Sequence, residues 1–184
     1  MKESSFRSIL RLSVTLLVIT AVVAACLAGV NAITADRIAA INEEKTQKAI
    51  AQVLPDAGEL TRLDRAAQWD AAVATVYSGS GGYAVEVTPV GFGGEISMMV
   101  GVGTDGKVLG ISIVRHTETA GLGAIAGADN AKGEAFRGQF VSASGTLSVT
   151  KDGGSIDAIS GATVTSRAVT EGVNIALQWV KNFG

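Results

Sequence analysis

The residues best suited to chemistry form one short segment near the end of the chain, Asp157-Ala158-Ile159-Ser160-Gly161-Ala162-Thr163-Val164-Thr165-Ser166. It combines small residues, which let another group approach the backbone, with hydroxyls, which can hydrogen-bond. A helical pattern follows, so Ser160 is expected to be the N-cap of a helix. The free N–H groups and dipole of a first helical turn favour an anion. Spacing alone fits a simple capped helix start better than a phosphate site, and both interpretations stay open.

A second polar segment contains His116 and Glu118, which together resemble part of a catalytic dyad. Ser112 or Thr117 would then supply the nucleophile. A triad also needs oxyanion donors and a positioned nucleophile, and nothing nearby resembles a nucleophile elbow. The pattern therefore gives a hydrolase little support. Alternatively, His116 is a polar residue at the end of a strand and has no functional role.

A glycine-rich segment, residues 101–107, matches the pattern G-x-G-x-x-G and comes close to a phosphate-binding loop. Both motifs require a helix after the loop, so that its N-terminus faces the phosphate. Residues 108–114 have the pattern of a strand instead. Val108 also stands where a phosphate-binding loop needs a hydroxyl. This segment is predicted to be a β-hairpin.

Composition excludes several classes of site. The single cysteine, Cys26, rules out an intramolecular disulfide and a cysteine-rich zinc or iron–sulfur centre. The single histidine rules out a multi-histidine metal site, so no metal centre is expected. A net charge of −2 gives no electrostatic reason to expect nucleic acid as a partner. Redox chemistry in this chain would therefore need an organic cofactor.

The N-terminal part predicts a membrane anchor. Residues 12–35 carry no charged side chain and would form a helix about 36 Å long, enough to cross a bilayer core of about 30 Å. Basic residues precede this stretch, which places residues 1–11 in the cytoplasm and the rest outside. A cleaved signal peptide would usually have a shorter apolar core. Lipoprotein processing at Val23-Ala24-Ala25-Cys26 remains an alternative.

The remainder predicts an α+β fold in which helices pack on an antiparallel sheet. A stalk is expected over residues 36–56, with its helix continuing until Pro55, before a domain formed by residues 57–184. Alternating patterns predict strands at residues 71–77, 83–88, 95–102 and 107–114, and a further strand at 140–150. Residues 117–138 are expected to form loops with short helices. An amphipathic helix is expected over residues 163–180.

The pattern Asp-x-x-Ser-Gly-Ala-Thr at residues 157–163 resembles the flavinylation motif of the FMN-binding domain family. That family includes the G subunits of Rnf-type ion-translocating complexes and the C subunits of sodium-pumping NADH:quinone reductases. In it, a separate flavin transferase joins the FMN phosphate to the motif threonine. The resemblance implies that Thr163 carries covalent FMN and that Asp157 serves the transferase encounter or the local turn. Residues of the same motif would hold the phosphate, namely Ser160, Gly161, Ala162, Thr165 and Ser166.

A second resemblance covers residues 116–123, which are similar to the Glu-Thr-Pro-Gly-Leu-Gly loop beside the isoalloxazine ring of the same family. Ala120 replaces the usual proline. The resemblance implies that Glu118, Thr119, Leu122 and Gly123 lie along the flavin and that His116 hydrogen-bonds near the ring. Residues 83–88 and Gly91-Phe92-Gly93-Gly94 also resemble the start of the sheet in the Rnf-type members.

These resemblances imply a relay of electrons within a translocase rather than an enzyme with turnover of its own. The expected function is to carry electrons in a complex that couples ferredoxin:NAD electron transfer to Na⁺ or H⁺ movement. Expected partners are the other subunits, the flavin transferase and the bilayer. The expected location is the cytoplasmic (inner) membrane, with the domain periplasmic or extracellular. Alternatives are a protein like the quinone reductase member of the family, a stand-alone flavinylated carrier and a non-redox anchored interaction domain.

Overall fold

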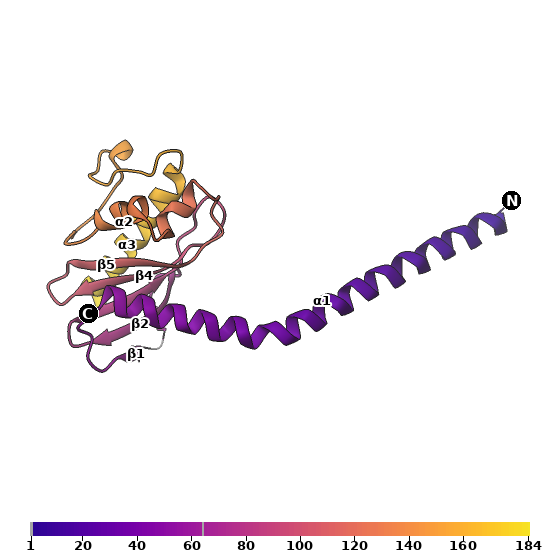
Figure 1. The fold of residues 1–184 in the computed structure, drawn as a ribbon, viewed down its shortest axis with the longest axis horizontal. Helices are drawn as coiled ribbons and strands as arrows, with labels where there is room; N and C mark the ends of the chain where they lie inside the picture. The colour runs from indigo at the N-terminus through magenta and orange to yellow at the C-terminus, as the bar shows by residue number, and fades with distance from the viewer. Residues whose placement is uncertain (1, 64) are drawn as a thin grey trace. The chain divides into compact units, whose positions relative to one another are not determined.

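The computed structural model describes residues 2–63 and 65–184, in two compact units that meet between Glu44 and Lys45 (Figure 1). Met1, the first residue of the expected cytoplasmic segment, lies outside the described residues. The first unit is helical. The second holds the sheet and the remaining helices, together with the last turns of the first helix. Each unit is considered separately below.

Helix α1 (Lys2–Val53) runs without interruption through the apolar stretch and the polar residues after it. Its segment from Leu10 onward is long and apolar enough to cross a membrane. The hydroxyls of Thr15, Thr20 and Thr34 each donate to a carbonyl four residues earlier, at 2.8–3.0 Å. Hydroxyls satisfied within the helix suit a medium that offers no water. The helix ends at Val53 rather than continuing to Pro55, because this proline fixes its own φ and disfavours helix at the preceding residue.

The second unit is built on a five-stranded antiparallel sheet whose strands pair in chain order. This confirms the predicted α+β fold. The four longer strands lie within a few residues of their predicted positions. The first strand in the chain was not predicted, because it is too short to show an alternating pattern. The strands are β1 (Thr61–Leu63), β2 (Val73–Gly79), β3 (Gly82–Val87), β4 (Ser97–Gly103) and β5 (Val108–Arg115).

The strand expected at residues 140–150 is wrong. This segment consists of turns that lead into a short 3₁₀ helix, η2 (Thr150–Asp152). Ser142 has a φ of 64° and Gly145 a φ of 77°, and neither value is compatible with an extended strand. The start of the segment is held instead by hydrogen bonds with Val108, whose N–H donates to Ala143 O and whose carbonyl accepts from Ser142 N.

Both faces of the sheet are covered. On one face, side chains such as Val85, Met98 and Val100 pack against the later helices. On the other, Ala84 and Met99 pack against the last turns of α1. All seven residues of β4 are buried as a result. A Cβ at Gly101 would overlap the carbonyl of Val53, so this glycine lets the helix backbone approach the sheet.

Helices α2 (Ala131–Gly138) and α3 (Thr163–Phe183) cover the larger core. The closing helix was predicted correctly and extends three residues further than expected. Its buried positions recur at helical spacing, and Trp179 near its end packs against Trp69 and Tyr83. The predicted N-cap is wrong, because the residue at that position is Ala162 and no side chain caps the helix.

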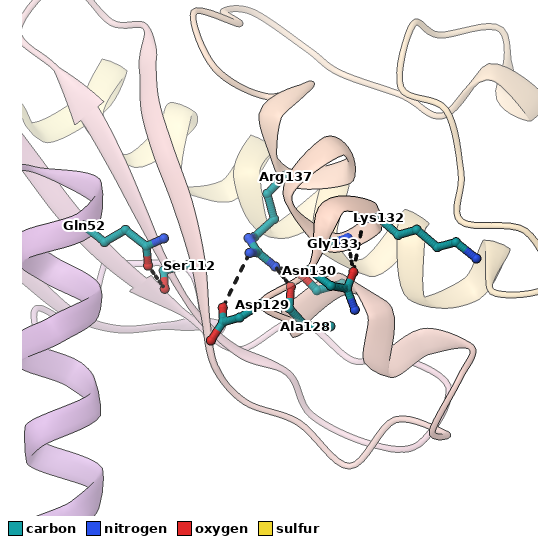
Figure 2. Close-up of polar contacts among 9 residues, drawn as sticks. Gln52, Ser112, Ala128, Asp129, Asn130, Lys132, Gly133 and Arg137 are labelled. Atoms are coloured by element: carbon teal, nitrogen blue, oxygen red, sulfur yellow. Dashed lines mark hydrogen bonds and ion pairs between the residues drawn. The ribbon is translucent and has the colours of Figure 1, made fainter.

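A buried arginine fixes the segment between β5 and α2, which includes the short helix η1 (Gly123–Gly127). The Arg137 guanidinium donates to the carbonyls of Ala126 and Ala128, at 2.8 and 3.0 Å, and lies 3.8 Å from a carboxylate oxygen of Asp129 (Figure 2). This contact pattern anchors the far end of the loop that starts at His116. The loops and short helices predicted over residues 117–138 are confirmed.

Two further contacts in Figure 2 complete this region. The side chain of Asn130 caps α2 by accepting from the N–H groups of Lys132 and Gly133. Ser112 on β5 donates to Gln52 Oε1 on α1 at 2.9 Å. The end of α1 is therefore tied to the sheet by a polar contact as well as by apolar packing.

Candidate functional site

Thr163 is the first residue of α3, and its side chain is half-buried. The preceding turn is closed by a hydrogen bond from Ala162 N to Ile159 O, and Gly161 within it has a φ of 78°. The helical bonding that follows includes Ser166 N donating to Ala162 O at 3.0 Å. The N–H groups of residues 163–165 precede that bond and point out of the helix end. A hydroxyl and several N–H groups thus share one helix terminus, which suits a phosphate.

Lys151 lies directly over this terminus. Its Nζ donates to Thr163 Oγ1 at 2.9 Å, although the two residues are 12 positions apart. Lys151 belongs to η2, which lies between α2 and the motif turn in the chain. Sequence patterns did not indicate this lysine, because nothing in its surroundings distinguishes it from a solvated surface charge. The contact adds a cation to the anion-favouring end of α3.

An ion pair fixes η2 to α3. Arg167 binds Asp152 through two hydrogen bonds of 2.7 and 2.6 Å, a bidentate arrangement. The Arg167 guanidinium holds the pKa of the Asp152 carboxyl below its usual range. In turn, the carboxylate raises the pKa of Arg167. Because Asp152 is the neighbour of Lys151, this pair keeps the lysine close to the helix terminus.

The two motif segments meet in one pocket of about 340 Å³. This volume is at the lower end of the range for small-molecule sites. Most of the predicted site residues line it: Glu118, Thr119, Leu122, Gly123, Gly161, Ala162, Thr163 and Thr165. Three further lining residues were not predicted to do so: Phe92, Lys151 and Val164. A larger cavity of about 810 Å³ near the other end of α3 contains neither motif.

The remaining predicted residues do not line this pocket. Ser166 is buried; its hydroxyl accepts from Ile159 N and donates to Ala162 O, each at 2.9 Å, so it holds the motif turn. Ser160 is exposed in that turn. His116 lines a separate cavity of about 440 Å³ beside Lys45 and Lys48, and its Nδ1 accepts from Glu118 N.

Asp157 is exposed and also lies outside the pocket. Its backbone N–H donates to Gln139 Oε1 at 2.7 Å, and its carbonyl accepts from Gln139 Nε2 at 3.2 Å. The start of the motif is thereby tied to the end of α2. Its carboxylate stays on the surface, where another protein could reach it.

The pocket has the composition expected for a ligand with a phosphate at one end and an aromatic ring at the other. Lys151 and the N-terminus of α3 form a positively polarised end. Phe92, Leu122 and Val164 supply apolar walls and are 73%, 43% and 48% exposed. A Cβ at Gly161 would lie 3.0 Å from Leu122 Cδ2, so the glycine lets the motif turn approach the loop of residues 116–123 (the ring-side loop of the resemblance) closely. These residues fit FMN.

Comparisons with known proteins agree with this geometry. The family described as FMN-binding domain matches residues 91–178, and the family described as RnfG N-terminal region matches residues 1–53. The chain is therefore an FMN-binding domain behind an N-terminal apolar helix.

Relatives of nearly the same length define the family further. The chain is 33% identical to the G subunit of the Na⁺-translocating ferredoxin:NAD⁺ oxidoreductase complex of Acetobacterium woodii, covering 98% of this chain and 95% of the relative. It is 34% identical to the G subunit of the ion-translocating oxidoreductase complex of Methanosarcina acetivorans, covering 96% and 97%. The G subunit of the proton-translocating ferredoxin:NAD⁺ oxidoreductase complex of Clostridium ljungdahlii is 46% identical over 55% of this chain and 54% of the relative. The chain belongs to the family of G subunits of Rnf-type ion-translocating oxidoreductase complexes.

Proposed function

We propose that this chain is the covalently flavinylated electron-transfer subunit of a membrane complex that couples ferredoxin:NAD electron transfer to Na⁺ or H⁺ translocation. Membership of the family of Rnf-type G subunits supports the place in such a complex. Relatives are named for both ions, so the proposal includes either. The chain is one relay of a translocase and turns over no substrate alone.

The observation that carries the proposal is the position of the Thr163 hydroxyl. It stands at the helix N-terminus, within 2.9 Å of the Lys151 ammonium, on the wall of the pocket formed by both motif segments. Attachment would form a bond between Thr163 Oγ1 and the phosphorus of FMN and break a bond from that phosphorus to a leaving oxygen, while the hydroxyl proton is released; relative to free FMN and threonine, the product lacks one water. Lys151 and the N–H groups of residues 163–165 would balance the charge that remains on the phosphodiester.

Attachment through the phosphate leaves the ring free of covalent bonds to the protein. FMN supplies the electron-transfer chemistry when it is bound. The apolar side chains of Phe92, Leu122 and Val164 would pack against the ring and limit its contact with water. Their partial exposure would leave part of the ring accessible to a redox partner.

The membrane topology forms part of the same proposal. Residues 1–11 would be cytoplasmic, residues 12–35 would span the inner membrane and residues 36–56 would form the stalk. Residues 57–184 would then lie in the periplasmic or extracellular space. A covalent bond is advantageous there because a dissociated flavin would be lost. The flavin transferase would act on the exposed side of the motif, where Asp157 lies.

Intact-mass spectrometry of the full-length chain, purified from membranes of a cell that has the flavin transferase, tests the proposal. We expect a mass increase of about 438 Da, the mass of FMN less one water. Thr163→Val should remove the adduct and Thr163→Ser should retain it, because serine keeps the hydroxyl. Thr150→Val is the matched control, since Thr150 is an exposed threonine of η2 outside the pocket. An adduct that survives in Thr163→Val, or is absent from the unmodified chain, would refute the assignment.

A further inference from the structure

Among residues 10–63 and 65–184, whose side-chain burial the structure describes, Glu118 is the one buried carboxylate, with 8% of its surface exposed. It lies on the wall of the flavin pocket. Within the same described residues no lysine, arginine or histidine forms an ion pair with it. A buried carboxylate without an ion pair is costly to maintain, so its presence beside a cofactor pocket calls for a reason.

Both carboxylate oxygens accept hydrogen bonds. Oε1 accepts from Gly93 N at 2.8 Å, and Oε2 accepts from the Thr165 hydroxyl at 2.5 Å. Each of the two oxygens therefore has a hydrogen-bond partner, and the carboxyl group is held in a fixed position from both sides.

The backbone around this carboxylate is shaped to receive it. A Cβ on Gly91 would overlap Glu118 Oε1, and a Cβ on Gly123 would overlap Oε2. The carboxylate therefore fits between segments that tolerate no side chain at these points. One segment precedes β4, one follows β5 and the third is the first turn of α3, which contains Thr165 two residues after Thr163.

We propose that Glu118 acts as a buried negative charge that joins the three segments lining the pocket and lowers the reduction potential of the flavin held there. The redox part of this inference rests on the function proposed above. A two-electron reduction that takes up one proton adds one negative charge to the ring. Glu118 gains and loses no electron, but its charge disfavours that addition. Because the carboxylate is buried, solvent screens its field less than it screens a surface charge.

The structural part of the inference concerns position. The bond to Thr165 fixes the ring-side loop against the helix turn that carries Thr163. The bond to Gly93 fixes the same loop against the segment that carries Phe92. Thr117 strengthens this second contact by donating to Gly93 O at 2.8 Å. One side chain thus sets the spacing between the tether, the loop beside the ring and an apolar wall.

Redox titration of the flavinylated full-length chain tests the charge. Glu118→Gln keeps the shape of the side chain and can still accept a hydrogen bond from Gly93, but it is neutral. We expect the equilibrium constant for two-electron reduction to rise at least tenfold, a shift of about 30 mV to higher potential. Glu95→Gln is the matched control: it removes the same charge from an exposed residue outside the pocket and should shift the potential far less.

A second variant separates the two roles and covers the case in which Glu118→Gln does not fold. Thr165→Val removes one donor to the carboxylate but leaves its charge. We expect a lower thermal unfolding midpoint, measured on the chain without flavin. We also expect a lower reduction potential of the flavin, because the Glu118 carboxylate loses a hydrogen bond that partly neutralises its charge. A higher potential in Thr165→Val, or an unchanged one in folded Glu118→Gln, would overturn the inference. Intact mass is recorded for every sample, so an unflavinylated native chain would indicate failure of the proposed function instead.

Discussion

Lys151 Nζ and Thr163 Oγ1 are 2.9 Å apart, and this contact joins a short 3₁₀ helix to the first residue of α3. The hydroxyl accepts a hydrogen bond from a cation, which leaves its proton free to depart when the oxygen forms an ester. The same cation would then be adjacent to the phosphate. This relationship therefore connects the proposed attachment site to the charge that the attached group brings.

The first prediction follows from that contact. Lys151→Gln should lower the rate of flavin attachment to Thr163 by about tenfold, because a charge-assisted hydrogen bond to the phosphate is lost. Lys151→Arg keeps the charge and should retain much of the rate. Lys132→Gln, which alters an exposed lysine of α2 outside the pocket, is the control. Attachment can be followed by the fraction of chain that carries the mass adduct; equal rates in Lys151→Gln and the control would contradict the prediction.

The second prediction concerns the motif turn. Gly161→Ala should destabilise the chain by about 1–2 kcal/mol, because the φ of 78° at this position is unfavourable for a residue with a Cβ. The added Cβ would also lie 3.0 Å from Leu122 Cδ2 and push the ring-side loop away. Unfolding of the full-length protein in detergent would measure the change. Gly138→Ala, at a helical position with open space around the Cβ, should be neutral or slightly stabilising.

The third prediction concerns the aromatic cluster at the end of α3. Trp179 packs edge-on against Trp69 and Tyr83, with ring centroids 5.2 and 5.6 Å apart. Trp179→Ala should cost about 3–5 kcal/mol of unfolding free energy. Trp179→Phe should cost clearly less, because the indole N–H has no hydrogen-bond partner among the described residues. Denaturant titration would compare the two, and similar losses would show that the indole N–H matters after all.

The fourth prediction concerns pH. Because Arg167 lowers the pKa of Asp152, the pair stabilises the fold above the ordinary carboxyl range near ~3.9. That contribution is lost as the pH falls through the lowered pKa of the folded state. Both side chains are partly exposed, so salt should weaken the effect. A carboxyl NMR titration should find the Asp152 pKa below that of an unpaired aspartate and closer to it in Arg167→Gln. A value that does not respond to this substitution would contradict the ion pair.

Several parts of the fold followed from local patterns. The hairpin at residues 101–107 was predicted because a strand rather than a helix follows it, and β4 and β5 confirm this. The closing helix was predicted from apolar residues at helical spacing. These patterns can be recognised from the sequence because each depends on residues close together in the chain. The strand predicted at residues 140–150 does not form, because positive φ values at Ser142 and Gly145 interrupt any extended run.

The sequence by itself was enough to locate the candidate threonine, the ring-side loop and the apolar helix. Each lies in a contiguous run of residues that has a recognisable pattern. Only the tertiary structure decided that Lys151 reaches Thr163, that Phe92 lines the same pocket and that Glu118 bonds to Thr165 across 47 positions. The physical reason is that such contacts depend on how the sheet, η2 and α3 pack together. Neither Lys151 nor Glu118 stands in a local sequence pattern that shows which threonine it contacts.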